Sequence, residues 1–288
     1  MIQTTSSQGN RPSVGELDLK TLKVRQEEAV LFVEINAPPM NLIGPELVNE
    51  LVTLIQTAEG DESVQVIVFK SADPDYFISH VDITRVSEYR EPAIKLTGEA
   101  SLGLLFRYLS TSRLTTIVQI EGRVRGAGSE FALACDMRFA ARETAVFGQP
   151  EAGFGLLPGA GGIQHLTRLM GRGRALEIIL SGEDYSADLA ERYGWINRAL
   201  PAAELEDFVS SLAHRIARFP AAARTLIKDR VNATALAPAA DFRSDSDLFL
   251  ETGRNAETQR RVQNSMKRGF QTRDWELELA RRLPELGS

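Results

Sequence analysis

The stretch that decides the fold is TTIVQIEGRVRGAGSEFALACD, residues 115–136. It opens with a β-rich run, residues 115–120, passes through a turn broken by glycines, and continues as an apolar helical segment from Phe131. Gly126 and Gly128 lack the Cβ atoms that would keep a ligand away from the main chain, and glycine tolerates positive φ. Backbone N–H groups at a helix start also lack partners of their own. The pattern favours an oxygen-binding site, although a turn that only lets the helix pack closely fits equally well.

The residues before this stretch predict a β-α-β unit. Residues 29–35 and 64–69 are β-rich runs that read as strands. A helix that starts after Gly44-Pro45 separates them, because apolar residues recur there at helical spacing. These are Leu47, Leu51, Leu54, Ile55 and Ala58. Since a helix connects the two strands, we expect them to be parallel.

The second half of the chain is predicted to be mainly helical. A helix is expected over residues 93–109, and from Gly171 onward the one clear strand pattern covers residues 195–200. Further helices are predicted over residues 174–180, 187–193, 204–218, 221–231 and 257–267. We therefore expect a frayed N-terminal tail (1–20), an α/β core (21–204), and a helical C-terminal region (205–288) that packs on the core or on a neighbouring subunit.

Composition excludes several classes of function. The 288 residues are 43% hydrophobic and 25% charged, which is the balance of an ordinary globular protein. A net charge of −6 leaves no excess positive potential for a nucleic acid partner. No stretch approaches the roughly 18 apolar residues of a membrane span. The single cysteine, Cys135, cannot form an internal disulfide, and the first twenty residues lack the apolar segment of a secretion signal. We expect a soluble, cytoplasmic protein without a membrane partner.

Two glutamates are the strongest candidates for chemistry. Glu130 follows the glycine turn, and Glu151 ends the stretch Phe147-Gly148-Gln149-Pro150-Glu151. For any single glutamate a solvated surface position is the commoner case. Both of these, however, lie between small or apolar residues, so partly desolvated carboxylates with perturbed proton affinity are expected. Two carboxylates that converge on one pocket can divide the work of moving a proton on and off a substrate.

A second glycine cluster, Pro158-Gly159-Ala160-Gly161-Gly162, resembles a phosphate loop only superficially. It lacks the Lys-Ser/Thr ending of a P-loop and does not follow a clear strand with the spacing of a dinucleotide fingerprint. A structural turn that leads into a helix over residues 163–170 is the better interpretation.

Taken together, these motifs resemble the signature of the enoyl-CoA hydratase/isomerase (crotonase) superfamily. The resemblance rests on residues 126–136, 147–151 and 155–162, in that order along the chain. It extends from the strand at Val30 to the strand at Trp195 and, more loosely, into the C-terminal helices. It implies an α/β fold, a spiral of β-β-α units with a C-terminal helical region, and assembly into homotrimers that often pair into hexamers.

The resemblance also implies a reaction. Members of the superfamily bind an acyl-CoA thioester and stabilise its enolate with two backbone N–H groups, which by position are those of Val81 and Ala127. Glu130 would be the base that activates water and Glu151 the acid, so the expected reaction is hydration of a 2-enoyl-CoA to a 3-hydroxyacyl-CoA. Residues expected to contact the substrate are Ser79, His80, Asp82 and Gly128. No metal or other cofactor is expected, since CoA is part of the substrate. Isomerisation, hydrolysis of the thioester, and binding of acyl-CoA without turnover stay open.

The chain departs from the superfamily pattern at Ser79-His80-Val81-Asp82, where small residues are common. His80 is either a loop side chain that faces solvent or fills a gap, or it points inward and polarises the thioester or narrows the acyl pocket. One residue more than the superfamily pattern separates Asp136 from Glu151. The helix that carries Leu102, Leu105, Phe106 and Leu109 could line the acyl pocket, but an apolar stripe of this kind is more often core.

Overall fold

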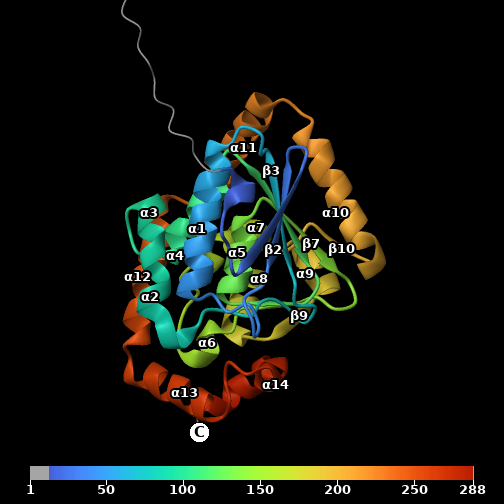
Figure 1. The fold of residues 1–288 in the computed structure, drawn as a ribbon. Helices are drawn as coiled ribbons and strands as arrows, with labels where there is room; N and C mark the ends of the chain where they lie inside the picture. The colour runs from blue at the N-terminus through green and yellow to red at the C-terminus, as the bar shows by residue number, and fades with distance from the viewer. Residues whose placement is uncertain (1–12, 288) are drawn as a thin grey trace, which may run out of the picture.

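The computed structural model describes residues 13–287, which form two β-sheets surrounded by helices (Figure 1). The larger sheet has the strand order β1-β2-β3-β5-β7-β10 and the smaller one the order β4-β6-β8-β9. The strands are β1 (Leu22–Glu27), β2 (Val30–Ile35), β3 (Val66–Ser71), β4 (Tyr76–Ile78), β5 (Thr115–Ile120), β6 (Arg123–Arg125), β7 (Met137–Ala141), β8 (Val146–Gly148), β9 (Asp184–Ser186) and β10 (Arg198–Leu200).

The chain winds as a spiral in which each turn adds one strand to each sheet. The pairs β3/β4, β5/β6 and β7/β8 each place their first strand in the larger sheet and their second in the smaller one, with helices after each pair. β2 and β3 are parallel, as predicted, with Val30 opposite Val66 and Ile35 opposite Ser71. The edge strand β1 pairs with β2 in the antiparallel sense.

Helices cover both faces of the larger sheet (Figure 1). They are α1 (Pro45–Gly60), α2 (Val86–Arg90), α3 (Ile94–Thr97), α4 (Leu102–Thr111), α5 (Ala127–Ala134), α6 (Glu151–Phe154), α7 (Gly162–Met170), α8 (Arg172–Ser181), α9 (Ala187–Tyr193), α10 (Ala202–Ala217), α11 (Ala221–Ala235), α12 (Ala239–Gly253), α13 (Ala256–Lys267), α14 (Arg273–Leu277) and α15 (Leu279–Arg282). On one face, α10 buries Leu205, Val209 and Ala213 against valines and aromatic residues of the sheet. The opposite face packs against α1, α4 and α5 in the main core.

The glycine turn between β6 and α5 is fixed by a close approach of two backbones. A Cβ atom on Gly128 would lie 2.3 Å from the carbonyl oxygen of Ile78 in β4, so only glycine fits there. Gly126 has a φ of 50°, which lies in the region that favours glycine. The helix α5 begins at Ala127, four residues before the predicted start at Phe131. Residues 127–130 of the glycine-rich stretch are therefore already helical.

The C-terminal helices pack on the core rather than extending from it. The segment from α13 to Gly287 lies beneath α6 in Figure 1, and its apolar side chains pack around Phe154. By contrast, α11 has no buried side chain and exposes Leu226, Ile227 and Val231. Among residues 13–287, no helix combines the length and apolar composition that a membrane crossing requires.

Two local expectations differ from the structure. The helix predicted over residues 93–109 is broken near Gly98, where φ is 77°, and α4 restarts with Ser101 as its N-cap. Residues 1–12 of the predicted frayed tail lie outside the described residues. Residues 13–20 are anchored to the core, because Val14 is buried and the N–H of Lys20 donates to Glu50 on α1, although most of their side chains are exposed.

Candidate active site

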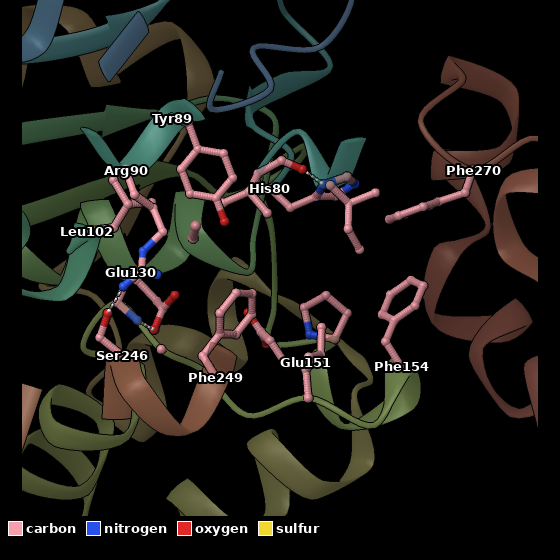
Figure 2. A pocket seen from close by; sticks show the side chains of 17 residues that line it. His80, Tyr89, Arg90, Leu102, Glu130, Glu151, Phe154, Ser246, Phe249 and Phe270 are labelled. Carbon is pink, nitrogen blue, oxygen red and sulfur yellow. Dashed lines mark hydrogen bonds between the residues drawn. The ribbon is translucent and has the colours of Figure 1, made fainter. Parts of the chain in front are cut away.

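One cavity contains both candidate glutamates (Figure 2). It encloses about 670 Å³, including the space at its mouth, and lies between the glycine turn and helices α2, α4, α6 and α12. Most of its wall is apolar. The apolar residues include Tyr89, Leu102, Pro150, Phe154, Leu156, Phe249 and Phe270. The two carboxylates therefore line one largely apolar space, which is what the sequence hypothesis requires.

Glu130 is held by the second glycine cluster. Its Oε1 accepts hydrogen bonds from the N–H groups of Ala160 and Gly162, each at 2.8 Å. The cluster leads into α7, as predicted, but it is also a cradle for a carboxylate, a role that the sequence interpretation missed. The available signal was a glycine-rich loop directly before a helix start, where free N–H groups bind anions.

Glu151 is the first residue of α6 and has a different environment. Its Oε2 accepts one hydrogen bond, from the Gln149 side-chain amide at 3.1 Å. Both Gln149 and Glu130 pack against Gly162, since a Cβ atom there would be 3.1 Å from Glu130 Oε1 and 3.3 Å from Gln149 Nε2. The sequence interpretation did not single out Gln149.

Burial makes both glutamates weaker acids than usual. It raises the pKa of Glu130 to about 7, against the two backbone hydrogen bonds, which lower it. Burial raises the pKa of Glu151 to about 8, and the nearby charge of Glu130 adds to this rise. Each carboxyl can therefore take up or release a proton near neutral pH, as a general base or acid must.

The two predicted main-chain donors line the same cavity. Val81 lies beside Ile43 in an isolated parallel bridge, in which the bonds run from Ile43 N–H to the His80 carbonyl and from Asp82 N–H to the Ile43 carbonyl. This pattern leaves the N–H of Val81 unused. Ala127 is the first residue of α5, where an N–H has no partner within the helix. Within residues 13–287, neither N–H donates to a protein acceptor, so both are free to bind a ligand oxygen.

His80 is buried and does not face solvent. Its Nδ1–H donates to the Val81 carbonyl at 2.7 Å, and its Nε2 lies 3.0 Å from Oε1 of the fully buried Glu276. The ring stacks on Phe270, with centroids 4.7 Å apart. Burial alone lowers the pKa of His80, but attraction by Glu276 and the hydrogen bond to it outweigh burial, and the pKa is raised. The imidazole fills a gap beside the predicted donor and forms part of the cavity wall.

The other predicted substrate contacts lie beside the cavity but do not line it. Ser79 is buried and donates to the Met40 carbonyl. Asp82 caps the short helix after it and accepts from Gln271, while Gly128 packs on β4. Their contact with substrate stays a prediction.

Of the apolar stripe on α4, only the first residue reaches the cavity. Leu102 contributes to its wall, whereas Leu105, Phe106 and Leu109 are packed in the core. The core interpretation is therefore correct for three of the four positions.

A polar group marks one end of the cavity. In Figure 2, Arg90 and Ser246 lie on the side of Glu130, and His80, Phe154 and Phe270 lie at the opposite side. Arg90 donates to the Ser246 hydroxyl at 3.1 Å. Neither residue was singled out from the sequence, because each comes from a helix whose pattern carries no motif.

A spiral of β-β-α turns with two buried acids and two free main-chain donors on one apolar cavity defines the crotonase class of folds. The chain matches the family model described as enoyl-CoA hydratase/isomerase over residues 25–276, and it belongs to this family. Both the predicted fold class and the resemblance are confirmed.

Individual relatives agree with this membership. A short-chain-enoyl-CoA hydratase of Clostridium acetobutylicum is 30% identical over 217 residues, which cover 75% of this chain and 82% of the relative. A crotonyl-CoA hydratase of Syntrophomonas wolfei is 31% identical over 67% of this chain and 74% of its own length. A crystal structure from Streptomyces avermitilis, of a candidate enoyl-CoA hydratase, is 52% identical, with a TM-score of 0.90 over 92% of this chain and 96% of that one.

Proposed function

We propose that the protein hydrates a 2-enoyl-CoA thioester to a 3-hydroxyacyl-CoA. The observation that carries the proposal is the pair Glu130 and Glu151, buried on one cavity with raised pKa values and different hydrogen-bond partners. Relatives that are named enoyl-CoA hydratases support the same reaction.

The environments of the two acids support a division of labour. Two backbone N–H groups stabilise the charged form of Glu130, which suits a base that takes a proton from water. Glu151 has one amide partner and the higher pKa, which suits an acid that delivers a proton to Cα. The water oxygen would add to Cβ and keep one proton as the new hydroxyl, while its other proton passes to Glu130 and Glu151 delivers its own proton to Cα. Return of a proton from Glu130 to Glu151 would restore the starting state.

The thioester oxygen would lie between the N–H groups of Val81 and Ala127. Charge develops on this oxygen when water attacks, and each donor aimed at it contributes on the order of 3 kcal/mol to the transition state. This arrangement would serve any enolate reaction on the same scaffold. The two acids favour hydration, because addition of water needs both a base and an acid.

A direct test is to follow the loss of the conjugated thioester absorbance of short 2-enoyl-CoAs and to identify the product by mass. Glu130→Gln and Glu151→Gln should each lower kcat at least about a hundredfold. The exposed Glu62 offers a matched Glu→Gln control that should not change the rate. A product of unchanged mass would indicate isomerisation, a free thiol would indicate hydrolysis, and binding without product would indicate a non-catalytic protein. Unchanged turnover in either variant would remove that glutamate from the mechanism.

We also propose that the chain acts as a homotrimer or hexamer in the cytoplasm. The apolar exposed side of α11, with Leu226, Ile227 and Val231, supports a subunit interface. Sedimentation analysis would test the assembly, and a monomer at micromolar concentration would contradict it.

A further inference from the structure

The end of the cavity at the side of Glu130 carries more hydrogen-bond donors than acceptors. Arg90, the last residue of α2, is partly buried and reaches Ser246 of α12 with Nη2. Ser246 is 4% exposed, and its oxygen also accepts from the Ser101 hydroxyl at 2.9 Å. Within residues 13–287, no protein acceptor receives the proton of Ser246. The guanidinium and this hydroxyl therefore both present unused N–H or O–H groups next to the cavity.

Arg90 also lacks a negative partner. Among the residues that the structure describes, no carboxylate lies within ion-pair distance of its guanidinium. Burial lowers the pKa of Arg90, and the exposed Asp247 acts on it only from further away. The neighbouring wall, with Leu102 and Phe249, is apolar. Because a partly desolvated cation without a partner is costly, its presence on a ligand cavity indicates that the ligand supplies the charge.

We propose that Arg90 and Ser246 bind an anionic oxygen of the substrate, and that this oxygen belongs to a carboxylate at the far end of the acyl chain. The inference rests on the proposed function and narrows its substrate class to 2-enoyl thioesters with a terminal carboxylate. A guanidinium binds a carboxylate through two parallel hydrogen bonds, and the Ser246 hydroxyl adds a third donor. The apolar lining of the cavity, which includes Leu102 and Phe249, suits the methylene groups between the reacting carbons and that terminus.

A phosphate of CoA presents the same chemistry and is the alternative source of the anion. The acyl carboxylate is favoured because Arg90 lines the same cavity as the two acids, whereas the long pantetheine arm separates the thioester from the phosphates.

The experiment compares three kinds of substrate with three variants. The substrates are 2-enoyl-CoAs ending in a carboxylate, 2-enoyl-CoAs of equal length ending in a methyl group, and methyl-ended pantetheine thioesters. The variants are Arg90→Met, Arg90→Lys, and Lys95→Met as a control, because Lys95 is exposed, outside the cavity, and bonded to Asn49. Arg90→Met should raise KM for the carboxylate series about 10-fold to 100-fold and leave the methyl-ended series within a few-fold. Arg90→Lys should raise KM for the carboxylate series less than Arg90→Met does, because lysine keeps the positive charge.

The outcomes distinguish an acyl carboxylate from a CoA phosphate as the anion that Arg90 binds. If Arg90→Met weakens every CoA thioester but spares the pantetheine thioesters, the anion subsite stands but its assignment to the acyl chain is overturned. If all three series change equally, or none changes, there is no anion subsite.

If the proposed function is wrong, the wild-type protein would hydrate none of the substrates. Calorimetric binding of saturated acyl-CoAs with and without a terminal carboxylate would still report whether Arg90 discriminates between them.

Discussion

Replacing Glu151 by glutamine should stabilise the protein while it lowers activity. Glutamine has the same size, and its side-chain oxygen can still accept from Gln149. In the unfolded chain a glutamate ionises near 4.5, but in the folded protein burial raises the pKa of Glu151 to about 8. Between these values the folded state binds the extra proton, so the free energy of unfolding falls as pH rises. The variant lacks this group and should not show its part of the fall.

The magnitude follows from the two pKa values. The difference between 4.5 and about 8, at about 1.4 kcal/mol for each pH unit, corresponds to about 5 kcal/mol. This is an upper bound for Glu151 alone, because part of the rise comes from the charge of Glu130. We therefore expect the variant to gain about 2 to 4 kcal/mol relative to wild type between pH 5 and pH 9. The gain should level off above about pH 8.

The assay is urea unfolding at pH 5, 7 and 9, at one protein concentration, followed by the fluorescence of the buried Trp195 and Trp275. Glu62→Gln, at an exposed position, controls for loss of one negative charge. A difference between Glu151→Gln and wild type that does not change with pH would refute the reasoning. So would a variant that is less stable than wild type at pH 9.

Two further predictions concern residues that lie behind the wall of the cavity. Gly128→Ala should destabilise the fold by about 1 to 3 kcal/mol in urea unfolding, because its Cβ would meet the Ile78 carbonyl. Gly173→Ala, in α8 with open space around its Cβ, should instead be neutral or stabilising, and equal losses in both would contradict the steric argument. Glu276→Gln should lower the NMR titration midpoint of His80, since the carboxylate is what raises its pKa. An unchanged midpoint would show that this pairing does not control the imidazole.

The sequence predicted the parts of the fold that have long, regular patterns. The strands β2, β3 and β5 begin and end within two residues of their predicted bounds. The helix α1 begins at Pro45, next to its predicted start. The longer strands β1 and β7 were not predicted, and β10 covers only the second half of the strand predicted over residues 195–200. The strands β4, β6, β8 and β9 were missed because each has three residues, too few for an alternating pattern. They are held by pairing with one another in the smaller sheet, which is information that a local window of sequence does not contain.

The same contrast applies to the site. Glu130 and Glu151 could be predicted because glycine and apolar neighbours mark them as buried. The partner of His80 could not, since Glu276 is 196 residues away and lies in an ordinary helical pattern. Arg90 and Ser246 come together for the same reason, through packing of α12 beside α2 and α4. Long-range packing therefore determines which side chains lie around the two glutamates.

The contact between His80 and the C-terminal segment has a consequence for biosynthesis. Three residues of this segment hold the loop that carries the Val81 N–H. The carboxylate of Glu276 pairs with His80, the ring of Phe270 stacks on it, and the Gln271 side chain accepts from the N–H of Ile83. A ribosome synthesises these residues after both acids, so a nascent chain that already contains both acids still lacks the support for one of its two main-chain donors. Truncation of the chain before Phe270 would therefore leave every strand of both sheets in place but remove the groups that hold the loop with Val81.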